Sequence, residues 1–275
     1  MNKKVVYTVL TNNYESPAHI AMEEGWDYVC LTDSDTLSSD QWTVRKIPEW
    51  VMQLPHNKRQ RIVKIMPHLF FKEYDISLYI DANVKLVKGK RLDDYVNEYL
   101  SESVIAIPTH PNRNCVYDEA SAVIMSRKDT TKKPTIQMDR YKSEGMPKKF
   151  GLWETNIMFR RHNDPECIEL MTKWALELLM GSHRDQLSIS YASYTTGIKI
   201  SSMPKNTRSS GAFKCDMRHR KTPAIKKPAQ APKPAGVIPR KASESTKKKV
   251  DAINKLHSRR VSHTDKSIMN FITEQ

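Results

Sequence analysis

Two polar residues interrupt an apolar stretch of the sequence, YDISLYIDANVKL at residues 74–86. Asp81 and Asn83 stand where the alternating apolar residues of a buried strand would otherwise continue. A carboxylate in such a run loses its hydration unless a cation or several hydrogen-bond donors replace it. Carboxylate and amide oxygens at a strand end can hold a divalent cation, although an Asp in this position can equally be a turn or cap residue. The stretch therefore leaves two interpretations open, a metal site or a turn.

The hydrophobic pattern predicts the elements that must position these residues. Four apolar runs are predicted strands: KKVVYTVL at 3–10, WDYVCLTDS at 26–34, SLYIDANV at 77–84 and SVIAIPTH at 103–110. KRQRIVKIMPHLFFKEY at 58–74 is amphipathic and is predicted to be a helix despite Pro67. Strands that alternate with helical segments predict an α/β fold, with a largely parallel sheet covered on both faces.

Polar residues follow the first three predicted strands at the point where each strand ends. In open sheets of this kind, ligands bind beyond the carboxyl ends of the strands. We therefore expect one rim of the sheet to gather five polar side chains: Asn12, Asn13, Asp33, Asp81 and Asn83.

Several motifs occur in a fixed order along residues 3–220: YTVLTNNYE, WDYVCLTDS, a basic helix ending near Pro67 and His68, SLYIDANV, CVYDEA, GLWETNIMFRRHN and RDQLSISYA. This order resembles the nucleotide-sugar glycosyltransferases of the GT-A fold, and more narrowly the TOD1/MUCI70-type family of glycosyltransferase-like proteins. The resemblance implies a GT-A-like (Rossmann-like) mixed, mainly parallel sheet with flanking helices, and leaves a basic C-terminal extension outside it.

The resemblance also implies a UDP-sugar donor and a divalent cation, Mn²⁺ or Mg²⁺. It assigns the uridine to the loops after the first two strands, which here points to Thr11, Asn13 and Asp33. It assigns the metal that bridges the diphosphate to Asp81 and Asn83. Because the commonest form of this motif has a second Asp where the chain has Asn83, we expect weaker metal affinity.

Other residues are candidates for contacting the phosphates or for catalysis. Arg61 and Lys64 could reach the phosphates, or could form a solvated helix face. His219 is the candidate third metal ligand, with an exposed or phosphate-contacting histidine as the alternative. An inverting transfer needs a carboxylate as general base, and the candidates are Glu154 and the slightly favoured Asp185, which could instead cap a helix. A retaining transfer needs no such base.

Three further side chains have alternative interpretations. Trp153 either builds the sugar or acceptor pocket or packs in the core. Trp42 and Arg45 either belong to a loop that closes over the donor or are ordinary packing residues.

The positive charge is concentrated at the C-terminal end. The formal net charge is +14, and residues 201–275 hold 18 Lys and Arg against 5 Asp and Glu. The Pro- and Lys-rich composition predicts an extended linker at 222–242, followed by a basic helical segment at 243–275 and preceded by the glycosyltransferase domain at 1–221. Such a tail can bind DNA by neutralising phosphates, or can serve only for solubility.

Together these features suggest a sugar transferase that acts on nucleic acid. The chain is similar to the bacteriophage enzymes that place glucose or arabinose on hydroxymethylated pyrimidines, so we expect 5-hydroxymethylcytosine in DNA as the acceptor. Trp153, Tyr117 or Phe213 could stack on a flipped base, or belong to the core. The alternatives are a glycan or protein acceptor, and a non-catalytic nucleic-acid-binding protein with a degenerate transferase fold.

The remaining composition bears on the compartment. Cys30, Cys115, Cys167 and Cys215 are widely separated and form no CxxC pair, which predicts reduced, mostly buried thiols rather than a zinc site or disulfides. No apolar run approaches the roughly 18 to 20 residues of a membrane span, and the first residues lack a signal peptide's apolar core. We therefore expect a cytoplasmic protein, in the host cytoplasm if a phage encodes it.

Overall fold

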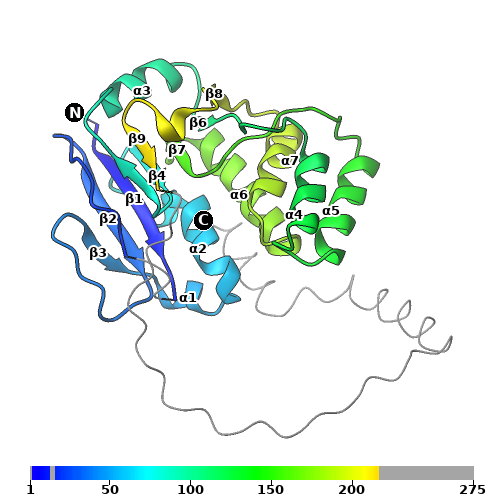
Figure 1. Cartoon of the computed structure of the whole chain (residues 1–275), viewed down its shortest axis with the longest axis horizontal. Helices are drawn as coiled ribbons and strands as arrows, with labels where there is room; N and C mark the ends of the chain where they lie inside the picture. The colour runs from blue at the N-terminus through cyan, green and yellow to red at the C-terminus, as the bar shows by residue number, and fades with distance from the viewer. Residues whose placement is uncertain (1, 13–15, 217–275) are drawn as a thin grey trace, which may run out of the picture.

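A computed structural model describes residues 2–12 and 16–216 of the chain (Figure 1). The described strands are β1 (Lys4–Leu10), β2 (Asp27–Thr32), β3 (Thr43–Lys46), β4 (Ile76–Ile80), β5 (Val84–Leu86), β6 (Ile105–Pro108), β7 (Ile157–Arg160), β8 (Ser201–Met203) and β9 (Phe213–Cys215). The described helices are α1 (Glu49–Met52), α2 (His56–Ile65), α3 (Leu92–Tyr99), α4 (Val116–Met125), α5 (Lys132–Ser143), α6 (Pro165–Met180) and α7 (Gln186–Thr196), with short 3₁₀ turns η1 (Pro67–Leu69) and η2 (Thr207–Ser209).

Seven of the described strands form one mixed sheet in the order β3-β2-β1-β4-β7-β6-β8. β1 pairs in parallel with β2 and β4, whereas β7 runs antiparallel to both of its neighbours, β4 and β6. β5 and β9 pair separately as a small antiparallel sheet. The predicted fold class, a mixed and mainly parallel sheet with flanking helices, is confirmed.

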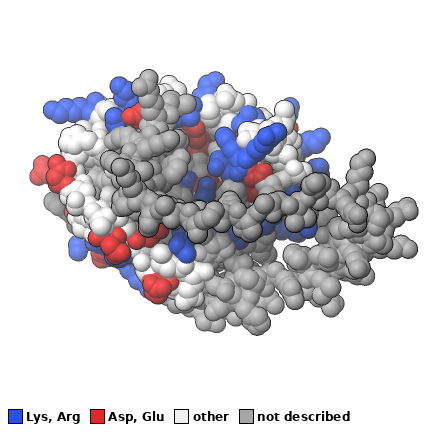
Figure 2. Space-filling view, turned by 60° about the horizontal axis from the view of Figure 1, so that its bottom comes forward, with Lys and Arg blue, Asp and Glu red and all other residues white. Residues whose placement is uncertain are grey.

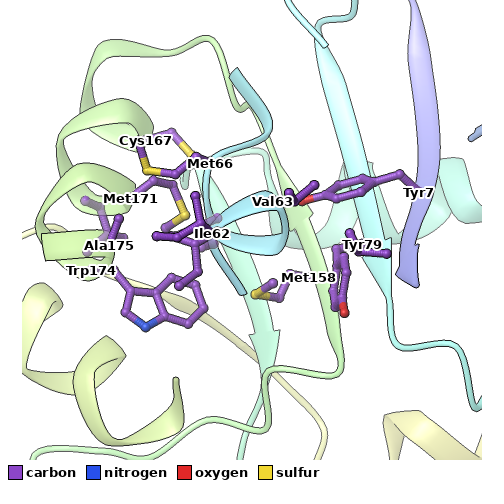
Figure 3. Close-up of a cluster of buried hydrophobic side chains, with 14 of the residues drawn as sticks. Tyr7, Ile62, Val63, Met66, Tyr79, Met158, Cys167, Met171, Trp174 and Ala175 are labelled. Atoms are coloured by element: carbon purple, nitrogen blue, oxygen red, sulfur yellow. The ribbon is translucent and has the colours of Figure 1, made fainter. Parts of the chain in front are cut away.

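The large sheet is buried on both faces, because alternate residues of β1 belong to different hydrophobic clusters. Tyr7 lies in the cluster that includes residues of α2 and α6, and Val6 lies in the cluster on the opposite face with residues of α3. Figure 3 shows Ile62 of α2 between Met158 of the sheet and Trp174 of α6. This packing fixes α2 against the sheet beside the ends of β1 and β4.

Helices α4, α5 and α7 form a third cluster outside the sheet (Figure 1). Tyr141 of α5 stacks on Tyr191 of α7 with their ring centroids 3.8 Å apart. The helix α7 also packs against α6, so this group of helices is attached to the layer that covers the sheet.

Two predicted boundaries are wrong. The helix predicted at 58–74 ends at Ile65, because Pro67 lacks an N–H and disfavours helical backbone at Met66, which has φ −111° and ψ 56°. The strand predicted at 77–84 ends at Ile80, and Val84 begins the separate strand β5. The polar residues between them form a turn, in which the N–H of Val84 donates to the carbonyl oxygen of Asp81.

Other predictions have mixed outcomes. All four cysteines are free and three are buried, as predicted, and burial raises the pKa of the Cys30 and Cys167 thiols to about 12. None of the helices in the described ranges is both long and apolar enough to cross a membrane. The predicted linker at 222–242 and the basic segment at 243–275 lie outside the described residues.

Candidate active site

A cleft with a volume of about 860 Å³ lies beyond the carboxyl ends of β1 and β4. Its size matches sites that hold drug-sized ligands, which are about 300–1,000 Å³. Figure 2 looks toward this side of the molecule and shows Lys and Arg side chains inside and beside a hollow. Eight residues predicted from the sequence line the cleft: Thr11, Asn12, Arg61, Lys64, Asp81, Asn83, Glu154 and Asp185.

Asp81 stands at the end of β4, where the strand meets the cleft. Its N–H donates to the carbonyl oxygen of Asn156, so the turn is fixed to the segment that begins β7. Its Oδ1 accepts a hydrogen bond of 2.7 Å from the Tyr79 hydroxyl and lies 3.6 Å from Nζ of Lys64. The side chain is 37% exposed, which leaves the carboxylate open to a ligand in the cleft.

Lys64 is the buried cation beneath the cleft. It lies at the C-terminal end of α2, and its Nζ is 2.7 Å from Oδ2 of Asp185. The same ammonium donates to the Thr155 hydroxyl at 3.1 Å, and that hydroxyl donates to Asp185 at 2.9 Å. The three groups form a closed polar network with two opposite charges at its centre.

Asp185 precedes α7 but makes no side-chain cap for it. Its carboxylate instead faces Lys64 and lies 3.7 Å from Nε of Arg61. Burial alone would raise the pKa of Asp185, but the Lys64 ammonium and the Arg61 guanidinium outweigh burial and hold this pKa well below its usual range. Asp185 is therefore a fixed negative charge and a weak proton acceptor.

Glu154 has the opposite electrostatic character. Its Oε1 accepts a 2.6 Å hydrogen bond from Arg208, whereas its Oε2 is buried without a hydrogen-bond partner. Burial raises the pKa of Glu154, the Arg208 guanidinium opposes this rise, and the charge on Asp81 adds to it. Of the two candidate bases, Glu154 has the pKa that is better matched to proton transfer near neutral pH.

The oxygen atoms near Asp81 fit a hard divalent cation. Within the described ranges, no group of three His, Cys, Asp or Glu side chains could hold a metal ion. Mg²⁺, however, is usually bound by one or two carboxylates together with the phosphates of a substrate. Asp81 and Asn83 line the cleft, and Oε2 of Glu154 and Oδ1 of Asn156 are buried acceptors without hydrogen-bond partners. Asp81 and Asn83 could therefore hold the cation once a diphosphate supplies the other ligands.

Two predicted donor residues do not line the cleft. Trp153 is buried in the core cluster, where its indole N–H donates to the Ser202 hydroxyl at 3.1 Å. The structure thus supports the packing interpretation of Trp153, and not a contact with the donor. Asp33 lies beside the cleft, since its Oδ1 accepts a 2.9 Å hydrogen bond from the N–H of Asn12, which lines it. Asn13 and His219 lie outside the described residues.

The other aromatic candidates pack within the protein. Trp42 is buried and donates to the carbonyl oxygen of Ala18, so it is a packing residue rather than part of a closing loop. Phe213 is buried in the cluster on the face of the sheet that carries α3, which rules it out as a stacking platform in this structure. Tyr117 is partly buried, and its hydroxyl donates to the carbonyl oxygen of Met146. Arg45 pairs with Glu73 at 3.0 Å.

Sequence reasoning missed the residues that support Lys64 from behind. Arg160 of β7 is fully buried and donates to the carbonyl oxygens of Lys64 at 3.0 Å and Ile65 at 3.3 Å. The Tyr7 hydroxyl donates to the same Lys64 carbonyl at 2.6 Å and accepts from Arg160 at 2.5 Å. The arginine in the run MFRR was a signal, because a strand with a buried pattern rarely contains an unpaired charge.

The solved structures that resemble the chain at low sequence identity include the following three. The bifunctional glycosyltransferase WbbM is 10% identical, with 74% of this chain and 39% of that chain covered and a TM-score of 0.44. Mouse xyloside xylosyltransferase 1 is 10% identical, with 72% and 84% covered and a TM-score of 0.46. The S. cerevisiae mannosyltransferase Ktr4p is 9% identical, with 68% and 62% covered and a TM-score of 0.35. With TM-scores below 0.5, these likenesses carry no argument about function.

The sequence of the chain matches the model of one protein family. No curated protein matches the chain. The sequence model of the TOD1/MUCI70 glycosyltransferase-like domain matches residues 33–216, which include the cleft residues Asp81 after β4, Glu154 before β7 and Asp185 before α7. The chain belongs to the TOD1/MUCI70 family of glycosyltransferase-like domains.

Proposed function

We propose that the protein transfers a sugar from a UDP-sugar to the hydroxyl group of 5-hydroxymethylcytosine in DNA. The observation that carries the proposal is the buried, ion-paired Lys64 beneath Asp81 in a cleft with more cations than anions. Among the described lining residues, six are Lys or Arg and four are Asp or Glu: Arg61, Lys64, Arg113, Lys128, Arg184 and Arg208 against Asp81, Glu119, Glu154 and Asp185. An anionic donor restores the balance of charge.

The diphosphate of the donor would lie over Lys64 and Arg61. Both cations are already ordered by their contacts with Asp185, at 2.7 Å and 3.7 Å, so little reorganisation is needed when the donor binds. Asp81 and Asn83 would hold Mn²⁺ or Mg²⁺, which when bound neutralises charge on the leaving diphosphate. Thr11 lies at the end of β1, where it and Asn12, whose N–H donates to Asp33, would contact the uridine.

In the transfer, the acceptor oxygen bonds to the anomeric carbon as the bond from that carbon to the UDP oxygen breaks. If the configuration inverts, Glu154 takes the proton of the acceptor hydroxyl, because its Oε2 is unpaired and its pKa is raised by burial. If the configuration is retained, the leaving phosphate oxygen takes that proton and Glu154 orients the acceptor hydroxyl. NMR of the anomeric proton of the product distinguishes the two.

The proposal of a DNA acceptor rests on charge. Residues 201–275 hold 18 Lys and Arg against 5 Asp and Glu, and such a segment gives salt-dependent affinity for phosphate backbones without sequence preference. A glycan or protein acceptor would need no such segment.

The test is transfer from a panel of UDP-sugars, with Mn²⁺, onto duplex DNA that contains 5-hydroxymethylcytosine and onto plain DNA. Mass spectrometry of the digested nucleosides should show one added sugar on the modified base alone, with wild-type protein and not with Asp81→Ala. Thermal stabilisation by UDP with Mn²⁺ serves as the control for donor binding. Stabilisation without any transfer would move the acceptor to a glycan or protein. DNA binding without stabilisation by UDP would favour the non-catalytic alternative.

A further inference from the structure

One exposed loop on the group of helices α4, α5 and α7 has no role in the chemistry described above. The PKKF loop, residues 147–150, connects α5 to the segment before β7, and all four of its residues are exposed. It presents two neighbouring ammonium groups, Lys148 and Lys149, and the ring of Phe150, which is 38% exposed. A single exposed apolar side chain is ordinary on a protein surface, so the notable feature of the loop is the combination of Phe150 with two neighbouring ammonium groups.

The PKKF loop is held in place at both ends. The Tyr117 hydroxyl donates to the carbonyl oxygen of Met146 at 2.8 Å, just before the loop. Just after it, the N–H of Gly151 donates to the carbonyl oxygen of Asn114 at 3.2 Å, and the Ser190 hydroxyl donates to the Gly151 carbonyl at 2.9 Å. The loop is therefore attached to the N-terminal end of α4 and to α7 (Figure 1).

Gly151 also makes this conformation possible. Its φ is +133°, a region that residues with a side chain rarely adopt, and an added Cβ would lie 2.9 Å from the Trp153 ring. The Phe150 ring meets the ring of Tyr194 edge-on, with centroids 5.6 Å apart, so one edge is fixed while the rest faces solvent. A pre-ordered aromatic ring can bind a partner at low entropic cost.

Two cations that line the cleft lie on the same group of helices as the PKKF loop. Arg113 lines the cleft and is followed by Asn114, whose carbonyl anchors the loop. Lys128 lines the cleft on the same group of helices. We call Arg113, Lys128, Lys148 and Lys149 the basic strip. Of its members, Arg113 is paired with an acid, Glu119, at 2.6 Å.

We propose that the basic strip binds the phosphates of the nucleic-acid strand next to the acceptor nucleotide, and that Phe150 stacks on an unpaired base of that strand. Ammonium groups that follow a backbone, together with an aromatic ring, are the combination that proteins use to bind single-stranded nucleic acid. A base taken out of the duplex for transfer leaves such a strand near the cleft. The inference rests on the proposed function, because it specifies where the acceptor polymer lies.

The test compares two double variants of the full chain with the same change in charge. Lys148→Glu with Lys149→Glu changes the PKKF loop, and Lys3→Glu with Lys72→Glu changes exposed lysines at the opposite, amino-terminal edge of the sheet. All four side chains are exposed, so both proteins should fold. The readouts are fluorescence anisotropy with labelled DNA at several salt concentrations, and the KM for DNA in the transfer reaction.

The slope of log affinity against log salt should decrease by about 0.9 for each phosphate that the protein no longer neutralises, and so by about 1.8 in the loop variant. At 0.1 M salt this corresponds to a loss of about 60-fold in affinity. The KM for DNA should rise, while thermal stabilisation by UDP stays unchanged. Phe150→Ala should also raise the KM, and Phe150→Trp should restore it. The control variant should differ little from wild type in any readout.

Three outcomes would overturn the inference. Equal losses of DNA affinity in the loop variant and the control variant would show that the basic strip contributes only non-specific positive charge. If wild type glycosylates DNA and the loop variant has the same KM for DNA, the basic strip does not bind the acceptor strand. The proposed function would remain intact. Loss of binding to an anionic polysaccharide but not to DNA would show that the strip serves a charged glycan. Failure of the wild-type protein to glycosylate any DNA is a failure of the proposed function itself.

Discussion

Replacing Lys64 tests whether the buried ion pair holds the cleft together. Lys64→Met would leave the Asp185 side chain, which is 9% exposed, with Arg61 at 3.7 Å as the remaining cation partner. Removing one member of a buried ion pair costs about 3–5 kcal/mol of unfolding free energy when the other charge stays buried, and the more distant Arg61 compensates the Asp185 charge only in part. We expect a loss of this size from Lys64→Met, and a comparable loss from Asp185→Asn.

The double variant carries the decisive measurement. When both charges are removed, neither is left uncompensated, so the loss should fall short of the sum of the single losses by about 2–3 kcal/mol. Urea unfolding of the three variants and wild type at pH 7, followed by circular dichroism, gives all four free energies. Losses that add within about 0.5 kcal/mol would refute a direct interaction between Lys64 and Asp185.

Two controls accompany this double-mutant cycle of Lys64 and Asp185. Lys46 and Asp35 form a pair on the surface, so replacing either should cause no resolvable loss of stability. The pH dependence has a defined sign, because the folded pKa of Asp185 is held below its unfolded value of about 3.9. The stability that Asp185 contributes is thus present above about pH 4 and is lost as the pH falls further. The difference between wild type and Asp185→Asn should shrink in acid.

Three other changes test the rest of the site. Arg208→Gln should move the acidic limb of the pH–rate profile to higher pH, because Arg208 opposes the raised pKa of Glu154; an unmoved limb would exclude Glu154 as the titrating group. Arg160→Lys should lower the unfolding free energy by about 2–4 kcal/mol, since a lysine cannot reach the carbonyl oxygens of both Lys64 and Ile65. The same change should raise the donor KM more than it lowers kcat. A donor KM equal to that of wild type would contradict a positioning role for Arg160. Asn83→Asp should tighten Mn²⁺ binding in the presence of UDP by about tenfold, as measured by calorimetry, whereas unchanged affinity would place the metal elsewhere.

The sequence predicted the part of the fold that depends on local patterns. The apolar runs at β1, β2, β4 and β6 mark strands because each is buried on both faces. Strand β7 was not predicted as a strand, and its direction depends on pairing: Tyr79 lies opposite Met158, which is 79 positions away in the chain. No local pattern contains such long-range information.

The lack of long-range information in local patterns also explains which parts of the site the sequence could predict. Residues at strand ends, such as Asp81, could be placed on one rim because parallel strands end at the same edge. The partnership of Lys64 with Asp185 joins two helices that are more than a hundred residues apart, so spacing could not predict it. The choice between a pocket role and a core role for Trp153 also could not be made from the sequence, because its hydrogen bond to Ser202 depends on where β8 lies.

The arrangement behind the cleft explains why an anionic donor should stabilise the protein. Arg160 is fully buried and, within the described part of the chain, forms no salt bridge; its charge is met by carbonyl oxygens and by Tyr7. Lys64 lies in front of it with Asp185 as its close counter-charge, so the floor of the cleft retains a positive field. A bound diphosphate removes this surplus without moving the cations, because their positions are fixed by the core. The unfolded chain has no such site, so UDP at 100 times its Kd should add about 2.7 kcal/mol to the unfolding free energy. That gain should weaken in Lys64→Met, where the cation nearest the proposed phosphate site is gone.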